Sequence, residues 1–273
     1  MNIETAIELN NLHFNQGLSL GEIGLTIDPS YVNPEQPVRK AFKKFDLSYV
    51  KGYRRGKCSV PRFFKEIDSE LKAYLLGFIY ADSCIYKNSL QTTSTDLEIL
   101  ELIRNTLSPG QEYHSCAGTE NQQVKLSLKI HNYFLVKDLK DKGITYNKTY
   151  DFNIEILESV SDDLMPHFIR GFFDGDGSIY ISKRTNGKLT RGFKLSNTNN
   201  FLLDYIENVF TQLGTKDFYK ESYMTDKGIR MNYYSLGNKD SFRIIYNYLY
   251  DNSEHFLSRK KIKFEEVLNS YSK

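Results

Sequence analysis

The chain has 273 residues, of which 40% are hydrophobic, with three cysteines and a net charge of +2. This length allows one large domain or two smaller ones, and the hydrophobic fraction is sufficient for a packed core. An odd number of cysteines without a CxxC pair argues against a disulfide framework or a zinc site. No apolar run approaches the length of a membrane span, and the N-terminus is unlike a signal peptide. We therefore expect a protein that is neither secreted nor membrane-bound, in the cytoplasm of a bacterial or phage-infected cell or in an organelle.

Several common catalytic motifs are missing from the sequence. The five histidines show no HxH or HExxH spacing, which argues against a catalytic zinc. There is no GxxxxGK[ST] stretch for a phosphate-binding loop and no GxSxG stretch for a serine hydrolase. These reaction classes are therefore not expected.

Residues 1–48 are predicted to form three short helices. Ser19 and Glu22 make a capping box at the start of the second helix. The third helix has an apolar face and a basic face. The basic positions are Arg39, Lys40, Lys43 and Lys44. The arrangement resembles a helix-turn-helix DNA-binding module, although any small three-helix unit gives a similar pattern.

The positive charge is concentrated in residues 38–65. This stretch contains ten Lys or Arg residues and one acidic residue, Asp46. Such an excess favours a polyanionic partner, and a solvated basic face is the alternative. In residues 49–65, which include Arg54 and Arg55, basic residues alternate with glycine and tyrosine. We interpret this segment as an extended linker that follows a phosphate backbone or enters a minor groove, or else as a flexible tether.

Two later stretches, residues 74–83 and 165–178, share one pattern. In each, small residues four positions apart lie on one face of a predicted helix, and an aspartate lies near the end of the helix. The small pairs are Gly77 with Ala81 and Gly171 with Gly175, and the aspartates are Asp82 and Asp176. Small residues at this spacing let two helix backbones approach closely. We therefore expect the two helices to pack together and to bring the aspartates side by side.

From about residue 66 the chain is duplicated, as residues 66–160 and 161–273. Each half is predicted to have the order αββαββα, in which the strands alternate between apolar and polar positions. The polar positions should face outward and include Tyr86, Asn88, Lys125, Lys129, Tyr180, Ser182 and Arg184. The predicted fold class is therefore α+β, with a small three-helix domain before the duplicated part.

The two motif stretches resemble those of the LAGLIDADG homing endonuclease family in its single-chain, two-repeat form. The second stretch is close to the family pattern. The first departs from it, because Tyr80 replaces the earlier acid and Ser83 replaces the last glycine. The resemblance implies that the two motif helices form the central interface, and that the two antiparallel sheets form a saddle over a DNA duplex.

The resemblance also implies a divalent metal site, for Mg²⁺ or Mn²⁺. Its ligands would be Asp82 and Asp176, with the preceding residues Ala81 and Gly175 at the same site. Mg²⁺ held by carboxylates can lower the pKa of a water molecule and neutralise a phosphate. The family places a lysine near the end of each repeat, which implies a catalytic role for Lys148 and Lys260. Lys261 or Lys263 could replace Lys260, and a solvated lysine is the alternative at each position.

The implied activity is site-specific cleavage of both strands of DNA, by a homing endonuclease with a helix-turn-helix at its N-terminus. The outward-facing strand residues would contact base edges, and Arg39, Lys40, Lys43, Lys44, Arg54 and Arg55 would contact the backbone. Because the two halves differ in sequence, a monomer would bind a long asymmetric target. The first residues and the last suggest a free-standing or intron-encoded enzyme. The alternatives are a splicing maturase that binds intron RNA and a non-catalytic DNA-binding regulator.

Overall fold

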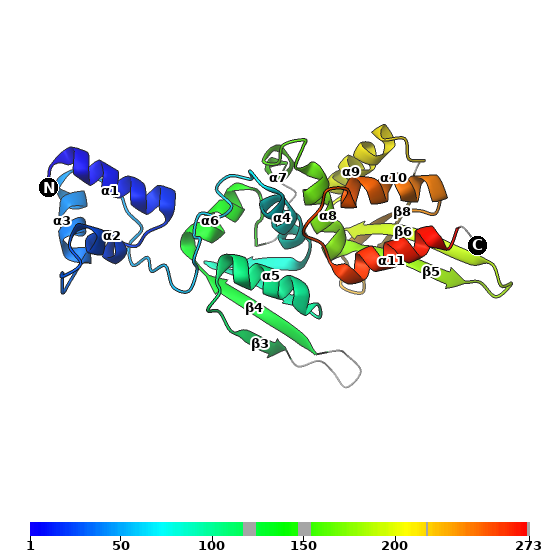
Figure 1. The fold of residues 1–273 in the computed structure, drawn as a ribbon, viewed down its shortest axis with the longest axis horizontal. Coiled ribbons are helices and arrows are strands. Elements are labelled where there is room, and N and C mark those ends of the chain that lie inside the picture. Colours follow the sequence, from blue (N-terminus) through cyan, green and yellow to red (C-terminus); the bar gives the residue numbers. More distant parts are fainter. Residues whose placement is uncertain (117–123, 147–153, 217, 272–273) are drawn as a thin grey trace. The chain divides into compact units, whose positions relative to one another are not determined.

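The computed structural model describes residues 1–273 except 117–123, 147–153, 217 and 272–273 (Figure 1). It contains two four-stranded sheets and the helices that cover them, which confirms the predicted α+β class. The chain divides into two compact units, Met1–Lys65 with Ile85–Asp141 and Glu66–Cys84 with Lys142–Lys273. Among the described residues, no helix has the length and apolar character that a membrane crossing requires.

The first unit begins with the three predicted helices, α1 (Ile3–Gln16), α2 (Leu20–Ile27) and α3 (Glu35–Lys44). Gly17 ends α1 with a φ of 69°, a conformation that favours glycine. The predicted capping box of Ser19 and Glu22 is present at the start of α2. The small core of the three helices consists of Leu9, Leu20, Ile23, Val38 and Phe42. The basic side chains of α3 lie outside this core and are exposed.

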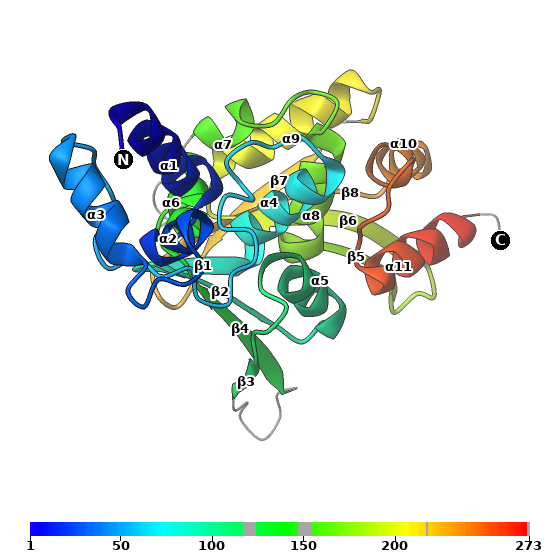
Figure 2. The same cartoon turned by 60° about the vertical axis from the view of Figure 1, so that its left-hand side comes forward.

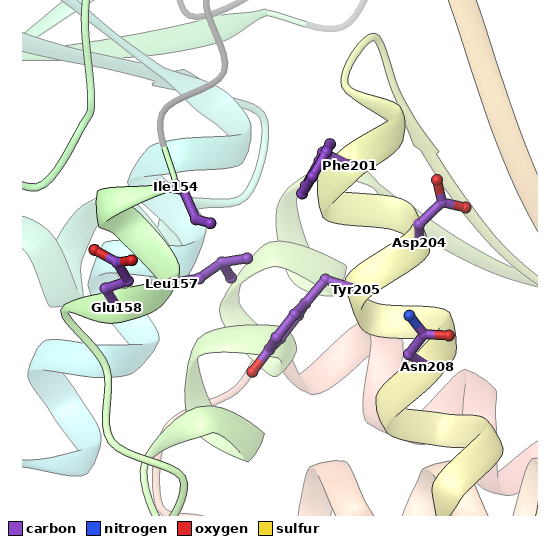
Figure 3. A pocket seen from close by; sticks show the side chains of 7 residues that line it. All are labelled: Ile154, Leu157, Glu158, Phe201, Asp204, Tyr205 and Asn208. Carbon is purple, nitrogen blue, oxygen red and sulfur yellow. The ribbon is translucent and has the colours of Figure 1, made fainter.

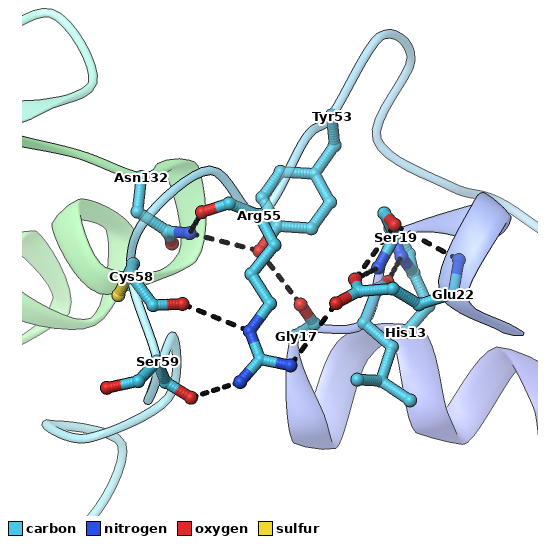
Figure 4. A network of polar contacts seen from close by, with 10 residues as sticks. His13, Gly17, Ser19, Glu22, Tyr53, Arg55, Cys58, Ser59 and Asn132 are labelled. Atoms are coloured by element: carbon cyan, nitrogen blue, oxygen red, sulfur yellow. Dashed lines mark hydrogen bonds and ion pairs between the residues drawn. The ribbon is translucent and has the colours of Figure 1, made fainter. Parts of the chain in front are cut away.

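The segment that follows these helices is held in place by buried hydrogen bonds (Figure 4). Tyr53 is 7% exposed, and its hydroxyl donates a 2.8 Å hydrogen bond to the carbonyl of Gly17. The side-chain amide of Asn132 donates to the same hydroxyl and to the carbonyl of Arg55, each at 3.1 Å. Tyr53 therefore joins the three-helix module to the first repeat within one unit. The alternative of a flexible tether without contacts does not hold at Tyr53, because this aromatic side chain is buried.

Arg55 contributes to the same contact by pointing inward. Its guanidinium donates to the carbonyls of Cys58 and Ser59 and forms an ion pair with Glu22, with an N–O distance of 3.2 Å (Figure 4). The neighbouring Arg54 is exposed and pairs with Glu35. The two adjacent arginines therefore have different surroundings, which a count of charges does not predict.

The sheet of the first repeat has the strand order β1-β2-β4-β3. Its strands are β1 (Ser83–Tyr86), β2 (Ser89–Ser94), β3 (Tyr113–Cys116) and β4 (Lys125–His131). Helix α5 (Leu97–Leu107) packs on β2 and β4, and α6 (Tyr133–Asp141) packs on β2 (Figure 2). In β4, Leu128 and Ile130 are buried while Lys125 and Lys129 are exposed, as their alternation predicts.

The second unit contains the other sheet, in the order β5-β6-β8-β7. Its strands are β5 (Gly177–Lys183), β6 (Leu189–Asn197), β7 (Tyr219–Met224) and β8 (Arg230–Leu236). Its helices are α4 (Glu70–Asp82), α7 (Glu155–Glu158), α8 (Met165–Asp176), α9 (Asn200–Gln212), α10 (Lys239–Tyr250) and α11 (Ser258–Asn269). The division into compact units differs from the predicted division into segments, because α4 belongs to the second unit and α5 and α6 belong to the first. The predicted boundaries at 48, 65 and 160 and the predicted saddle stay predictions.

Helices α4 and α8 pack with their backbones in contact. A methyl group at Gly77 would lie 2.0 Å from the carbonyl oxygen of Phe168, and one at Gly171 would lie 2.0 Å from that of Tyr74. Both separations are far below van der Waals contact, so neither position has room for a side chain. The expected pairing of the two helices through small residues is therefore present, and residues 73–80 of α4 are buried as a consequence.

We predict that Gly171→Ala will lower the stability of the protein by about 3 kcal/mol, because the added methyl group meets a backbone carbonyl that only a shift of the whole helix can move. Gly110→Ala is the control, since its methyl group would have no neighbour within 4 Å. It should change the stability by less than about 1 kcal/mol. Thermal unfolding of the two variants measures the difference, and equal melting temperatures would show that α4 and α8 are further apart than described.

An arginine is buried behind this helix pair. The side chain of Arg170 in α8 is fully buried, with an ion pair of 2.6 Å to Glu70. It also donates to the carbonyls of Leu249 and His255, at 2.6 and 2.7 Å. Burial raises the pKa of Glu70, but hydrogen bonds from the backbone N–H groups of His255 and Glu254 and the charge of Arg170 outweigh it and hold this pKa below its ordinary value. Arg170 therefore fixes the start of α4 and the segment after α10 to α8.

We expect Glu70→Gln to destabilise the protein by about 3 kcal/mol at neutral pH, because it leaves the buried guanidinium without its counter-charge. The pKa of Glu70 is lowered in the folded state, so its contribution is present above the ordinary value of 4.5 and is lost as the pH falls below it. Urea unfolding over the range from about pH 3.5 to about pH 7 should therefore show that the difference in stability from the natural protein closes at low pH. The exposed Glu66→Gln serves as control, and a gap that does not depend on pH would contradict the ion pair.

Candidate active site

The packing of α4 on α8 brings the ends of both helices together. A methyl group at Gly175 would lie 2.3 Å from the Cβ of Ala81 and 3.5 Å from the Cβ of Asp82. Asp82 is exposed and Asp176, the residue after Gly175, is half-buried. Each aspartate is the last residue of its helix. A helix C-terminus carries partial negative charge, so two carboxylates at two adjoining C-termini favour a bound cation.

The carboxylate of Asp176 is held by an asparagine from the neighbouring sheet. The side-chain amide of Asn197, at the end of β6, donates a 2.6 Å hydrogen bond to Oδ2 of Asp176. Its own oxygen accepts from the backbone N–H of Asn199 at 2.9 Å. The buried side chain of Asn232 in β8 in turn donates to the carbonyls of Asn197 and Thr198. These contacts fix one orientation of the Asp176 carboxylate.

The sequence did not single out these asparagines. Asn197 and Asn199 belong to a polar run between a strand and a helix, which is typical of a turn and a helix cap. Asn199 does cap α9, since its side chain accepts from the N–H groups of Phe201 and Leu202. Only the pairing of β6 with β8, in which Asn197 is opposite Asn232, shows the second role of this run.

A cavity of about 240 Å³ lies beside Asp176. Its lining includes Tyr80, Ala81, Asn197 and Met231. The hydroxyl of Tyr80 accepts a 3.1 Å hydrogen bond from the side-chain amide of Asn199. Burial raises the pKa of Tyr80, with the Asn199 contact opposing the shift, so this hydroxyl stays neutral near the two aspartates at neutral pH.

Comparison with known proteins identifies this arrangement. Residues 163–250 match the family described as the LAGLIDADG-like domain. The LAGLIDADG meganuclease I-AabMI, solved bound to uncleaved DNA, has a similar fold, with a TM-score of 0.50 and 14% identity. The alignment covers 75% of this chain and 92% of that one. The chain has the two-repeat LAGLIDADG fold.

Two further proteins are similar to this chain. The homing endonuclease I-WcaI, solved on its DNA recognition sequence, gives a TM-score of 0.48 at 15% identity, over 87% of this chain and 96% of that one. An uncharacterised protein of Methanocaldococcus jannaschii, MJ0314, is 26% identical over 155 residues. That match covers 54% of this chain and 55% of the archaeal protein, about half of each.

The departure of the first motif at Tyr80 has a structural explanation. The earlier acid of the second motif, Asp174, is 2% exposed and accepts 2.8 Å hydrogen bonds from the Tyr74 hydroxyl and the Leu257 N–H. Burial raises the pKa of Asp174 to about 6, although the charge of Lys260 opposes the shift. Tyr80 occupies the corresponding position in the first motif and bonds Asn199. The earlier position therefore anchors each helix to the second unit and leaves the last aspartate at the helix end.

Lys260 lies at the same helix end. It is 5% exposed, and its Nζ donates to the carbonyls of Phe173 and Gly177 at 2.5 and 2.7 Å. Burial lowers the pKa of Lys260 to about 8, while the charges of Asp174, Asp176 and Asp82 oppose the shift. The lysine therefore neutralises the last carbonyls of α8 close to the two site aspartates. Its catalytic role stays a prediction.

The other lysines considered from the sequence are placed differently. The Nζ of Lys261 lies over the ring of Phe256, 4.1 Å from its centroid, and Lys263 pairs with Glu266 at 2.8 Å. The charges of Asp82 and Asp176 act on the pKa of Lys260. Lys148 falls in residues 147–153, outside the described part of the chain.

The predicted DNA contacts in the two repeats are all exposed: Tyr86, Asn88, Lys125 and Lys129 in the first, and Tyr180, Ser182 and Arg184 in the second. Asn88 and Arg184 were predicted as strand positions, but they lie just beyond the ends of β1 and β5, where the chain turns toward the next strand. In β5 the side chains of Ile179 and Ile181 are less exposed than those of their neighbours, as the alternation predicts. The strand positions and the exposed basic positions of α3 therefore stay available for contact, whereas Arg55 is engaged within its own unit. All these DNA-binding roles stay predictions.

An apolar cavity of about 450 Å³ lies elsewhere in the second unit, between α7 and α9 (Figure 3). Ile154 and Leu157 line it on one side, and Phe201 and Tyr205 on the other (Figure 3). Its described lining residues include none of the predicted site residues.

Proposed function

We propose that this chain is a site-specific DNA endonuclease that hydrolyses phosphodiester bonds in both strands, with Mg²⁺ or Mn²⁺ held by Asp82 and Asp176. The observation that carries the proposal is that two helices packed through glycines each end on an aspartate, beside the contact of Gly175 with Ala81. Two carboxylates at adjoining helix ends are unfavourable on their own, because each lies at a negative helix end and near a like charge. A divalent cation between them offsets all of these repulsions.

The residues at the helix ends fit such a cation. Hard divalent cations take oxygen ligands, and Asp82 and Asp176 supply carboxylates that solvent can reach. Ala81 and Gly175 are in contact beside them and leave no bulky side chain at the junction. When bound, the ion would supply Lewis-acid stabilisation of a phosphate group. The hydrogen bond from Asn197 would hold the Asp176 carboxylate in one orientation, as partners of metal ligands commonly do.

Lys260 would stabilise the two carboxylates electrostatically. Its charge lies close to both aspartates and to the last carbonyls of α8, so it lowers the cost of two carboxylates at this place. Two carbonyls already accept hydrogen bonds from Nζ, so we assign to Lys260 a positioning role for Asp176, with direct contact to a phosphate as the alternative. Lys148 is the corresponding proposal for the first repeat.

The proposed partner is double-stranded DNA with a long asymmetric site, because the two repeats carry different side chains on their exposed strand positions. I-AabMI and I-WcaI, which are similar in fold, were both solved bound to DNA. Tyrosine, serine, lysine and arginine at these positions can donate to or accept from base edges and phosphates. Intron-encoded homing is the lifestyle we propose, with a splicing maturase as the second reading.

We predict that Asp176→Asn abolishes cleavage while DNA affinity is nearly unchanged. The substitution removes a metal ligand but keeps the shape of the side chain and its contact with Asn197. The melting temperature should stay the same or rise, because a repulsion between carboxylates is removed. A duplex recovered by binding selection from a randomised library provides the substrate, and the exposed Asp163→Asn is the matched control.

Full cleavage in Mg²⁺ by the double variant Asp82→Asn with Asp176→Asn would rule out the proposed mechanism. Specific DNA binding by the natural chain without cleavage in either Mg²⁺ or Mn²⁺ would favour a regulator. A stronger affinity for folded intron RNA than for any selected duplex would favour the maturase.

The basic face of α3 gives a further prediction, on salt dependence. Each phosphate contact steepens the fall of DNA affinity with salt by about 0.9 in a log–log plot. The substitutions Lys40→Gln, Lys43→Gln and Lys44→Gln together should therefore flatten the slope by up to about three. Lys137→Gln, on α6 and paired with Asp141, is the control. An unchanged slope would remove α3 from the DNA contacts. Point substitutions are preferable to truncation, since residues 1–65 pack within the first unit.

A further inference from the structure

A basic pocket lies within the first unit, apart from the aspartates. It has a volume of about 450 Å³. The segment that includes Arg54 and Lys57 forms part of its lining, and the strand residues Lys129 and His131 form another part. His114 adds a second imidazole, and the described lining residues include no carboxylate. The lining therefore carries three permanently charged side chains, of which Arg54 is paired with Glu35.

The lining is fixed by hydrogen bonds between the segment and the first repeat. The Ser108 hydroxyl donates to the carbonyl of Lys57 at 2.7 Å, and the Ser59 N–H donates to the carbonyl of Leu107 at 2.9 Å. The side-chain amide of Asn132, the residue after β4, donates a 3.1 Å hydrogen bond to the carbonyl of Arg55. These contacts hold the backbone on both sides of Lys57 against the first repeat, so the fold fixes the place from which the Lys57 side chain extends.

The chemistry of the lining indicates its ligand. A lining rich in cations favours an anion, and the side-chain amide of Gln111 supplies a further donor to an oxygen. Arg54 is partly neutralised by its ion pair with Glu35, which leaves Lys57 and Lys129 as the main charges. Lys57 comes from the segment before the first repeat and Lys129 from β4, which carries the predicted DNA contact Lys125.

We infer that this pocket binds one phosphate group of the backbone of bound DNA, with Lys57 and Lys129 on the same phosphate. The inference rests on the proposed DNA partner and not on cleavage. It gives the segment 54–58 a specific function, which is to extend the DNA contact of the first sheet toward the N-terminal helices of the same unit.

A double-mutant cycle tests whether the two lysines share a phosphate. The affinity for a duplex of about 30 base pairs is measured without metal over a range of salt concentrations, for Lys57→Ala, Lys129→Ala and the pair. Two lysines on one phosphate should be coupled, by about fivefold or more in affinity. The pair should flatten the salt slope by about one, whereas two independent contacts would flatten it by about two. Additive effects on affinity and slope would overturn the inference.

The matched control is a second cycle in which Lys51 takes the part of Lys57. Lys51 is an exposed lysine of the same segment and is not among the residues that line the pocket. The cycle of Lys51→Ala with Lys129→Ala should show no coupling. Coupling as large as that of Lys57 would show a general effect of charge and would also overturn the inference. Both pocket lysines are exposed, so the variants should fold, and their melting temperatures verify this.

A second arm separates a DNA phosphate from a free one. Inorganic phosphate is titrated while the amide NMR signals of Gly56 and Ser108 are followed. Weak binding, which the pair of substitutions removes, is expected together with coupling on DNA. Tight binding of inorganic phosphate with no coupling on DNA would instead make the pocket a site for a free anion. None of these measurements requires cleavage. A negative result for the pocket therefore does not count against the roles proposed for Asp82 and Asp176. If the protein does not cleave DNA, the double-mutant cycle can still be measured from binding.

Discussion

The contact between the backbones of α4 and α8 is the constraint on which the candidate active site depends. Gly77 and Gly171 have no room for a methyl group, so the separation of the helices is set by main-chain atoms. Main-chain contact leaves little freedom in the distance or rotation of the pair, because no side chain can change its rotamer between them. The positions of Asp82 and Asp176 at the two helix ends follow from this geometry.

Such an arrangement is costly in the absence of a ligand, and the surroundings offset part of the cost. Asn197 donates to Asp176, and Lys260 covers the last carbonyls of α8 with a positive charge. Lys260 itself is buried, and burial lowers its pKa. Unfavourable burial of charge is common where a protein holds groups ready for a ligand. Ordinary structural ion pairs such as that of Arg170 with Glu70 lie one turn or more away and stabilise the same helices.

The first unit uses its arginines and lysines in several ways. Arg55 is directed inward and joins the three-helix module to the rest of the unit, while Arg54 and Lys57 line a pocket. The lysines of α3 remain exposed on a helix whose opposite face is buried. A single basic stretch of sequence therefore contributes to folding contacts and to the lining of the pocket for which we propose a ligand. Its total charge overstates the number of side chains that can reach a polyanion.

The sequence by itself determined most of the elements and singled out the residues of the proposed site. Periodicity located the strands and helices, and the spacing of Gly77 with Ala81 and of Gly171 with Gly175 predicted the helix pair, because small residues four apart lie on one face of a helix. The family resemblance, confirmed for the fold, supplied the metal-binding role that is proposed for Asp82 and Asp176. These signals are local or come in matched pairs, so they can be recognised without coordinates.

Only the tertiary structure decided which distant groups meet. Asn197 and Asn232 become neighbours through the register of β6 and β8, and Lys260 reaches the end of α8 through the packing of α11. The burial of Arg170 depends in the same way on carbonyls supplied from elsewhere in the fold, and Arg55 is turned inward by Glu22 of the three-helix module. A polar side chain has the same signal in the sequence whether it meets water or a buried partner. The difference arises only when the chain closes around it, because hydrogen bonds and desolvation depend on atoms far along the sequence.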